Sequence, residues 1–108
     1  MSKGDIVLIP FPFSDLSGHK VRPGLVLYEQ KGGEDFIVVF ISSVKQAKLG
    51  NFDVRIKASQ TNGLKADSFI RTDKIATLQK KIVLGELGKL ETTAYKLVKD
   101  KLRKILAI

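Results

Sequence analysis

The sequence predicts a mainly β protein, a small and strongly bent antiparallel sheet or barrel that ends in one α-helix. Two observations carry this prediction. Several short apolar or alternating runs are separated by turn-forming residues, and only the C-terminal stretch has a helical repeat. The 108 residues and the 44% hydrophobic content fit one globular domain, since a chain of this size can bury a sizeable core. We see no linker, low-complexity tract or internal repeat.

The first half of the chain contains three predicted strands. Residues 5–9 (DIVLI) are a short continuous apolar run, typical of a buried strand. Pro10 is the first of two prolines that follow this run. They are expected to stop regular pairing, so the segment after the run is predicted to be an irregular loop or a sheet edge. The next two strands are predicted at residues 25–28 and 36–41, and the sequence KGGE at 31–34 predicts a hairpin turn between them.

The second half of the chain contains a segment of alternating apolar and charged residues and two further short runs. Apolar and charged side chains alternate over residues 52–57, which predicts a half-buried strand with Asp53 and its charged neighbours on the outer face. Residues 58–66 are polar and turn-rich. Two more short strands are predicted at residues 68–71 and 74–78.

The last element is an amphipathic helix over residues 92–106. Either Glu91 or Thr92 could cap its start. Its apolar residues recur at helical spacing with lysines between them: Ala94, Leu97, Val98, Leu102, Ile105 and Leu106.

The charge of the chain is strongly positive. Nineteen Lys and Arg stand against eleven Asp and Glu, giving a formal net charge of +8 and a pI near 9.8. Such a surface attracts polyanions and supplies phosphate contacts, which favours nucleic-acid binding. The alternative is an ordinary solvated lysine surface, since fifteen of the nineteen cations are Lys.

Metal, disulfide and membrane chemistry are all disfavoured. The chain has no cysteine and a single histidine, His19, so it lacks the ligands that zinc sites usually need. We expect no metal and no other cofactor. The N-terminus is not a convincing signal peptide and no apolar run approaches the length of a membrane span. We therefore expect a cytoplasmic protein with no membrane partner.

Four blocks of the chain resemble one known family in the same order. Residues 4–27 (GDIVLIPFPFSDLSGHKVRPGLVL) are similar to the N-terminal signature of the MazF/PemK toxins of type II toxin–antitoxin systems. The later blocks are FISS at 40–43, GLKADSFIRTDKIATL at 63–78 and LGELGKL at 84–90. The resemblance covers nearly the whole chain, and four blocks in series are more specific than any one of them.

The resemblance implies a fold and a function. The fold would be an SH3-like antiparallel barrel with a C-terminal helix, in agreement with the residue patterns. The activity would be cleavage of single-stranded RNA by a homodimer, without metal. The partner would be a cognate antitoxin that blocks the site, acidic to match the charge of +8, with operator DNA reached only through the antitoxin.

Metal-free RNA cleavage uses the neighbouring 2′-hydroxyl as nucleophile. It needs a base, a cation for the charge that builds on the phosphate, and a proton for the leaving 5′-oxygen. Arg22 is the first choice for the cation, because Arg has planar donors that match phosphate and Pro23 restricts its backbone. The family's active-site Arg falls on Arg22. The alternative is a structural ion pair with Asp5 or Asp15.

Two hydroxyls follow from the resemblance. Ser42 stands where the family typically has an active-site Thr, and Ser43 follows it. Ser keeps the donor hydroxyl but lacks the methyl group that restricts a Thr rotamer. The alternative is a strand end whose hydroxyls satisfy backbone groups.

Arg71 and Asp73 match an Arg and an acidic residue that some family members use in acid–base chemistry. Alternation along a strand would put the two on one face. Asp73 can accept a proton, whereas Arg71 cannot readily release one and is expected to stabilise charge. A cross-strand ion pair is the alternative.

His19 is a candidate general acid or base near neutral pH, and an exposed histidine without a role is the alternative. Residues expected to bind RNA are Ser43, Lys20, Lys45 and Ser17. Ala76 departs from the family, since many relatives carry Arg there.

Two classes of function therefore stay open. One is a sequence-preferring endoribonuclease toxin. The other is a catalytically decayed, non-enzymatic barrel that binds RNA or a partner, favoured by Ser42 and Ala76. A DNA-binding repressor is disfavoured, because one predicted helix cannot make a helix-turn-helix motif.

Overall fold

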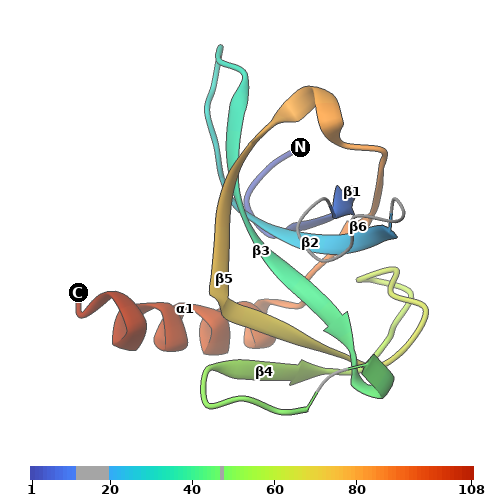
Figure 1. Ribbon diagram of the computed structural model, residues 1–108, viewed down its shortest axis with the longest axis vertical. Coiled ribbons are helices and arrows are strands. Elements are labelled where there is room, and N and C mark those ends of the chain that lie inside the picture. Colours follow the sequence, from blue (N-terminus) through green and yellow to red (C-terminus); the bar gives the residue numbers. More distant parts are fainter. Residues whose placement is uncertain (12–19, 47) are drawn as a thin grey trace.

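The computed structural model describes residues 1–11, 20–46 and 48–108 (Figure 1). These residues form one antiparallel sheet of six strands and a C-terminal α-helix. The elements in chain order are β1 (Asp5–Phe11), β2 (Lys20–Glu29), β3 (Asp35–Ser43), the 3-10 turn η1 (Val44–Gln46), β4 (Asp53–Ile56), β5 (Ser68–Gln79), the 3-10 turn η2 (Lys80–Ile82), β6 (Gly85–Lys89) and α1 (Thr92–Leu106).

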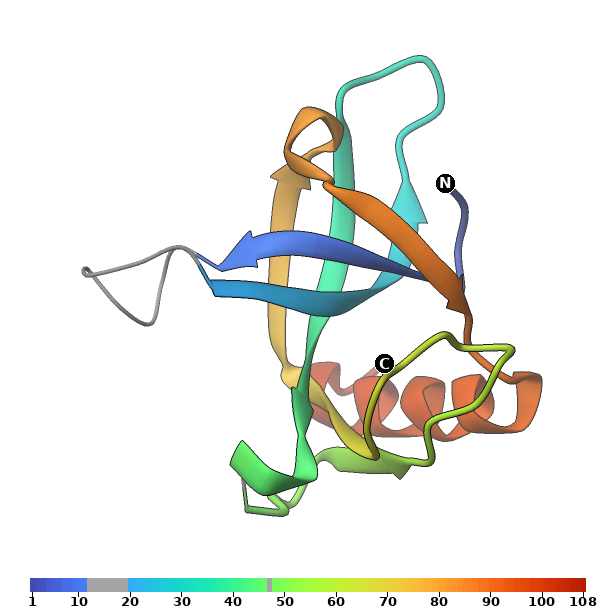
Figure 2. The ribbon, with the colours of Figure 1, turned by 90° about the vertical axis from the view of Figure 1, so that its right-hand side faces the viewer.

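The sheet has the strand order β4-β5-β3-β2-β1-β6 and curls into a half-barrel (Figure 2). Apolar clusters cover both of its faces. Val98 of α1 packs against one cluster, which contains Ile6, Leu25 and Ile41. The other cluster includes Phe36 and its neighbours on β1, β2 and β3. Because both faces are buried, the central strands are nearly continuous apolar runs.

The predicted mainly β fold with one terminal helix is confirmed, and so are several of its parts. The helix covers residues 92–106 as predicted, and Ala94, Tyr95 and Leu102 pack beside Val98 on the core. The hairpin turn at 31–34 is present, closed by a hydrogen bond from the Gln30 backbone N–H to the Asp35 carbonyl. Within the described part of the chain, no helix has the length and apolar character needed to cross a bilayer.

The prediction that pairing stops at Pro10 is wrong. β1 continues to Phe11, and Pro10 pairs with Val21 of β2. Beyond Leu8, β1 has no pairing with β6, so only one neighbouring strand remains there. A proline is tolerated at such an edge, because its missing N–H removes no ladder hydrogen bond on the open side.

The second half of the sheet also differs from the prediction. Residues 68–79 are one long strand, β5, rather than two short ones. The register against β3 shifts within it, since Phe40 pairs with Arg71 whereas the adjacent Val39 pairs with Ile75. β6 was not predicted as a strand, because two of its five residues are glycine and its apolar pattern is weak.

The feature that shapes the functional surface is the separation of β2 from β3. Their ladder ends at the pair Gly24 and Phe40, after which β2 pairs only with β1 and β3 only with β5. A Cβ at Gly24 would lie 2.5 Å from Cγ2 of Val38, so the strands come this close only because residue 24 has no side chain. Beyond this close approach the two strands are no longer paired, and an opening lies between them.

Candidate active site

A groove of about 360 Å³ occupies the opening between β2 and β3, and we call it the β2–β3 groove. β2 contributes one wall, β3 and β5 contribute another, and the segment after Gly63 contributes the third. Its charged side chains are Arg22 and Lys65, and no carboxylate lines it within the described part of the chain. The full lining is Leu8, Val21, Arg22, Pro23, Ile41, Ser43, Leu64, Lys65, Ala66, Ser68 and Leu87.

The register places Arg22 and Ser42 on the same face, one on each side of the opening. Gly24 and Phe40 are direct partners, and Arg22 and Ser42 lie two residues beyond them on their antiparallel strands. Side chains two residues apart on a strand share a face. Arg22 also lies opposite Ile9, whose side chain belongs to the same apolar cluster as that of Phe40. The two predicted residues therefore flank one opening; Arg22 lines the β2–β3 groove, and Ser42 is not among its lining residues.

Ser43 faces the other side of β3 and lines the β2–β3 groove itself. It pairs with Ser68 of β5, whose hydroxyl donates to the Ala66 carbonyl at 2.9 Å. Ser68 and Lys65 line the same groove and were not among the residues selected from the sequence. Lys65 lies within the turn-rich stretch at 58–66, where the pattern carried no sign that the chain folds back beside Arg22.

Arg71 makes the cross-strand ion pair that was the structural alternative to its catalytic role. Its partner is Asp53 of β4, with Arg71 Nε 3.0 Å from Asp53 Oδ1. The contact is an ion pair, and the buried Nε of Arg71 makes no hydrogen bond within the described part of the chain. The prediction that Asp53 lies on a solvated outer face is wrong. It is 8% exposed, because it pairs with Arg71 and its Oδ2 accepts the Gly50 N–H at 2.6 Å.

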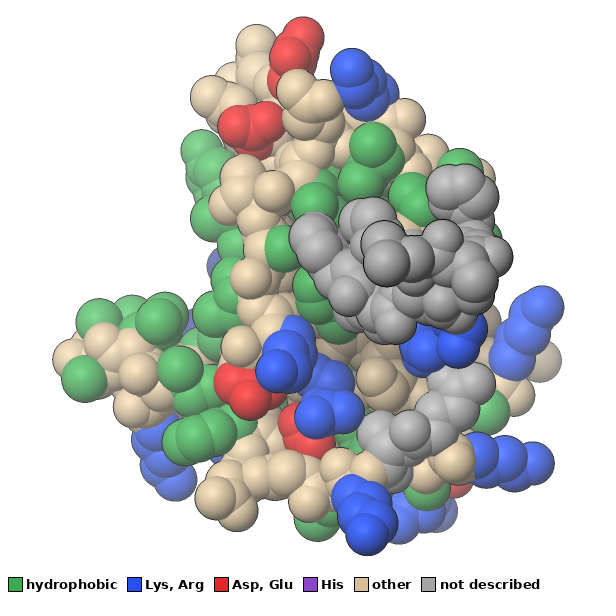
Figure 3. Space-filling view, in the orientation of Figure 1, with side chains coloured by type: hydrophobic (Ala, Val, Ile, Leu, Met, Phe, Trp, Pro, Cys, Tyr) green, Lys and Arg blue, Asp and Glu red, His purple; other side chains and the backbone are tan. Residues whose placement is uncertain are grey.

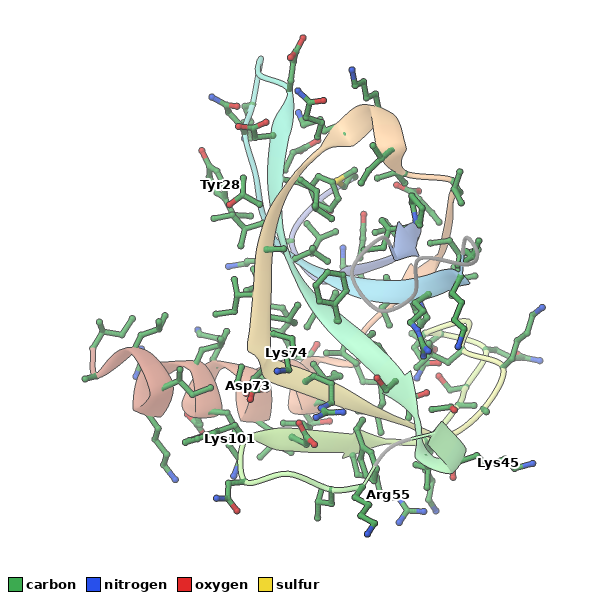
Figure 4. All side chains as sticks on the ribbon, in the orientation of Figure 1. Tyr28, Lys45, Arg55, Asp73, Lys74 and Lys101 are labelled. Carbon is green, nitrogen blue, oxygen red and sulfur yellow. The ribbon has the colours of Figure 1, made fainter. Side chains whose placement is uncertain are left out.

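The shared face predicted for Arg71 and Asp73 stays a prediction, because the pairing of β5 with β3 is interrupted immediately after Arg71. The register shift inserts residues 72–74 between the positions that pair with β3. Ala76 packs on the apolar cluster that contains Phe40, the partner of Arg71, so the alternation changes phase within the inserted residues. Asp73 is exposed at the bend of β5, near α1 (Figure 4).

The remaining predicted residues are less informative. His19 and Ser17 lie outside the described residues. Lys20 is exposed at the start of β2. Lys45 is exposed on η1 and extends away from the sheet (Figure 4).

Positive charge surrounds this surface of the molecule. Figure 3 shows Lys and Arg side chains spread over the lower half of the face, with few Asp and Glu among them. This face of the molecule therefore attracts a polyanion.

The wall that carries Lys65 is held by a buried network around Asn62, which is 0% exposed. Its Oδ1 accepts the backbone N–H groups of Ser59 and Leu64, both at 3.0 Å. Its Nδ2 donates to Oε1 of Glu91 at 3.1 Å, and the Ser59 hydroxyl donates to Oε2 at 2.6 Å. The hydrogen bond from Ser59, with help from Asn62, lowers the pKa of Glu91, although desolvation opposes the shift.

Comparison with solved structures defines the class of this fold. MazF from Deinococcus radiodurans matches with a TM-score of 0.80 and 19% identity, over 100% of this chain and 97% of that one. The Mycobacterium tuberculosis toxin MazF-mt6 matches at 0.77 and 17%, over 96% and 97%. An endoribonuclease from a mycobacterial species, solved with its cognate antitoxin, matches at 0.77 and 17%, over 100% and 96%. The chain thus has the fold of the MazF toxins.

The family follows from the sequence. The model of the PemK-like, MazF-like toxins of type II toxin–antitoxin systems matches residues 2–106. The chain belongs to this family. The resemblance stated from the four sequence blocks is confirmed. No match was found among curated protein sequences.

Proposed function

We propose that this protein is a toxin that cleaves single-stranded RNA without metal, at the β2–β3 groove. The observation that carries the proposal is the register of Arg22 and Ser42, which puts a cation and a hydroxyl on one face of the opening. The endoribonuclease and MazF descriptions of the structural neighbours support the activity. The groove's cationic lining, without a described carboxylate, suits a phosphodiester.

In the proposed reaction the 2′-oxygen attacks the adjacent phosphorus and the bond to the 5′-oxygen breaks. The products are a 2′,3′-cyclic phosphate and a 5′-hydroxyl. Arg22 holds the non-bridging oxygens, where negative charge grows, and the Ser42 hydroxyl donates to one of them. Removal of the 2′-hydroxyl proton and protonation of the 5′-oxygen are proposed for Asp73 and His19, without an order between them.

Arg71 has a supporting role in this proposal. Its ion pair with Asp53 holds the guanidinium in place. Arg71 is the β5 partner of Phe40, which in turn pairs with Gly24 of β2. Ser42 lies two residues beyond Phe40 on β3, and Arg22 lies two residues before Gly24 on β2. From there Arg71 adds positive charge beside the scissile phosphate. Lys20, Lys45, Ser43 and Lys65 are proposed to bind the RNA strand on both sides of the cut.

The partners follow from the family. We propose a homodimer and an acidic antitoxin that covers the groove, with operator DNA contacted only through the antitoxin. Solved complexes of MazE with MazF from Deinococcus radiodurans support an antitoxin partner. The net charge of +8 suits an acidic one.

The proposal is tested by incubating the purified protein with a long single-stranded RNA in excess EDTA and mapping the fragment ends. Discrete cuts that leave cyclic phosphates are expected. Cuts that appear only when a divalent metal is restored would contradict the metal-independent reaction.

The second candidate is a non-catalytic basic barrel that binds RNA or a partner. The ion pair of Arg71 with Asp53 favours it, because this contact gives Arg71 the structural role that was the alternative to a catalytic one. A folded protein that binds RNA in EDTA but leaves every bond intact would establish this candidate.

A further inference from the structure

A second basic groove lies where the N-terminal segment, the end of β6 and the first turns of α1 meet, and we call it the helix groove. It has a volume of about 250 Å³ and shares no lining residue with the β2–β3 groove. In Figure 2 these three segments meet at the right, whereas the end of β1 and the start of β2 lie at the left. Its lining is Lys3, Gly4, Lys89, Leu90, Thr92, Tyr95, Lys96 and Lys99.

The helix groove carries uncompensated positive charge. Lys89 is paired with Asp5 at 3.4 Å, but no carboxylate pairs with Lys3, Lys96 or Lys99 within the described part of the chain. The charge continues along α1 to Arg103, which lines an adjoining depression with Lys96, Lys99 and Asp100. From residue 96 to residue 103 a helix rises about 10 Å, so the strip can contact more than one phosphate.

An aromatic side chain lies among these lysines. Tyr95 packs its ring partly against the core, and the remainder forms part of the groove lining. The Lys3 ammonium is 6.0 Å from the ring centroid, at the outer limit of a cation–π contact. Basic side chains around an exposed aromatic surface are the combination that holds single-stranded nucleic acid, through phosphate contacts and base stacking.

We propose that the helix groove is a second RNA-binding site, which holds the substrate strand outside the segment that is cut. This inference rests on the proposed endoribonuclease function. The lining favours RNA over an acidic peptide for two reasons. First, Tyr95 offers a ring surface on which a base can stack, beside four lysines that can neutralise phosphates. Second, the exposed apolar residues that could anchor a peptide, Leu97 and Leu106 of α1 and Ile108 beyond its end, are not part of the lining.

The test uses the exposed double variant Lys96→Ser/Lys99→Ser. Its matched control is Lys31→Ser/Lys81→Ser, which removes the same charge from exposed residues that do not line the helix groove. Affinity is measured over a range of salt concentrations for a long RNA whose 2′-hydroxyl is absent at the cut site. Cleavage is measured on that sequence as normal RNA, and on a short RNA that spans the cut alone.

The helix-groove variant is expected to bind the long RNA about tenfold more weakly, with a salt slope smaller by about 1.4 for two lost phosphate contacts. Cleavage of the short RNA should stay at the wild-type rate, and the control should resemble wild type throughout.

Equal losses in both double variants would overturn the proposal, because net charge alone would explain them. Unchanged binding of the long RNA by the helix-groove variant would also overturn the proposal. Cleavage by the wild-type protein in the same experiment would still support the proposed endoribonuclease function. Wild-type protein that neither binds nor cuts RNA would instead overturn the proposed function. A poly-glutamate peptide that outcompetes the RNA at this site would show that the groove takes an acidic peptide.

Discussion

Arg71 on β5 and Asp53 on β4 are direct strand partners, with Nε of one 3.0 Å from Oδ1 of the other. Asp53 is a buried carboxylate in a strand whose alternation predicted an exposed one. The pair joins β4 and β5, the two strands at one edge of the sheet, and orients the Arg71 guanidinium that is proposed to act beside the site. The ion pair is therefore expected both to stabilise the sheet and to position the Arg71 side chain.

A double-mutant cycle with Asp53→Asn and Arg71→Gln measures that pair. The coupling is expected to be about 1–2 kcal/mol in the free energy of unfolding by urea, since Asp53 is buried. The exposed pair of Lys89 and Asp5 is the control and should couple by about 0.5 kcal/mol or less. Equal couplings for the two pairs would show that burial of Asp53 adds nothing.

Substitutions of Ser42 test whether its hydroxyl group takes part in cleavage. Ser42→Ala should lower kcat about 100-fold, because a donor to the developing phosphate charge is lost. Ser42→Thr should retain or raise activity, since it keeps the hydroxyl and adds a methyl that restricts the rotamer. Single-turnover cleavage with thermal unfolding as a folding check makes the comparison. Full activity in Ser42→Ala would remove Ser42 from the site.

Glu91 should make stability depend on pH in the acid range. Its folded pKa is lowered below the ordinary 4.5, so the carboxylate stabilises the protein at neutral pH and this stabilisation is lost as the pH falls through the folded value. The difference in unfolding free energy between wild type and Glu91→Gln should therefore be largest near neutrality and shrink below about pH 4.5. A difference that stays constant into acid would contradict the ionic contribution.

Gly63 tests how the groove wall docks on β6. Its φ is +71°, and a Cβ there would lie 2.1 Å from the Leu87 carbonyl oxygen. Gly63→Ala should cost about 2 kcal/mol or more in unfolding free energy. Gly85→Ala is the control, because it lies on the same strand as Leu87 and its Cβ would meet nothing within 4 Å. Similar effects of the two substitutions would show that the close approach at Gly63 is unimportant.

The helix and strands whose apolar residues recur with a clear period, or form a continuous run, could be predicted from the sequence. The repeat at Ala94, Val98 and Leu102 gave helix α1 with the observed bounds, because one helix face packs on one core. The apolar runs located β1 to β3 for the same reason. β6 escaped prediction because it is held by pairing with β1, a partner about eighty residues away in the chain.

The site was less predictable, for a geometrical reason. Arg22 and Ser42 were selected through the family resemblance, and only the strand register shows that they share a face. The association of Arg71 with Asp73 assumed an uninterrupted period of two, which the shift within β5 breaks. Lys65 could not be selected, because its proximity to Arg22 depends on how the segment containing Gly63 folds back.

The most direct test compares wild type with Arg22→Ala on a long single-stranded RNA in excess EDTA, with Arg55→Ala, an exposed arginine of β4 outside the groove, as control. Wild type and the control should leave cyclic phosphate ends at the same sites, and Arg22→Ala should lose at least about 100-fold in rate while staying folded. Cleavage by Arg22→Ala at the wild-type rate and sites would contradict the assignment of the active site to the β2–β3 groove.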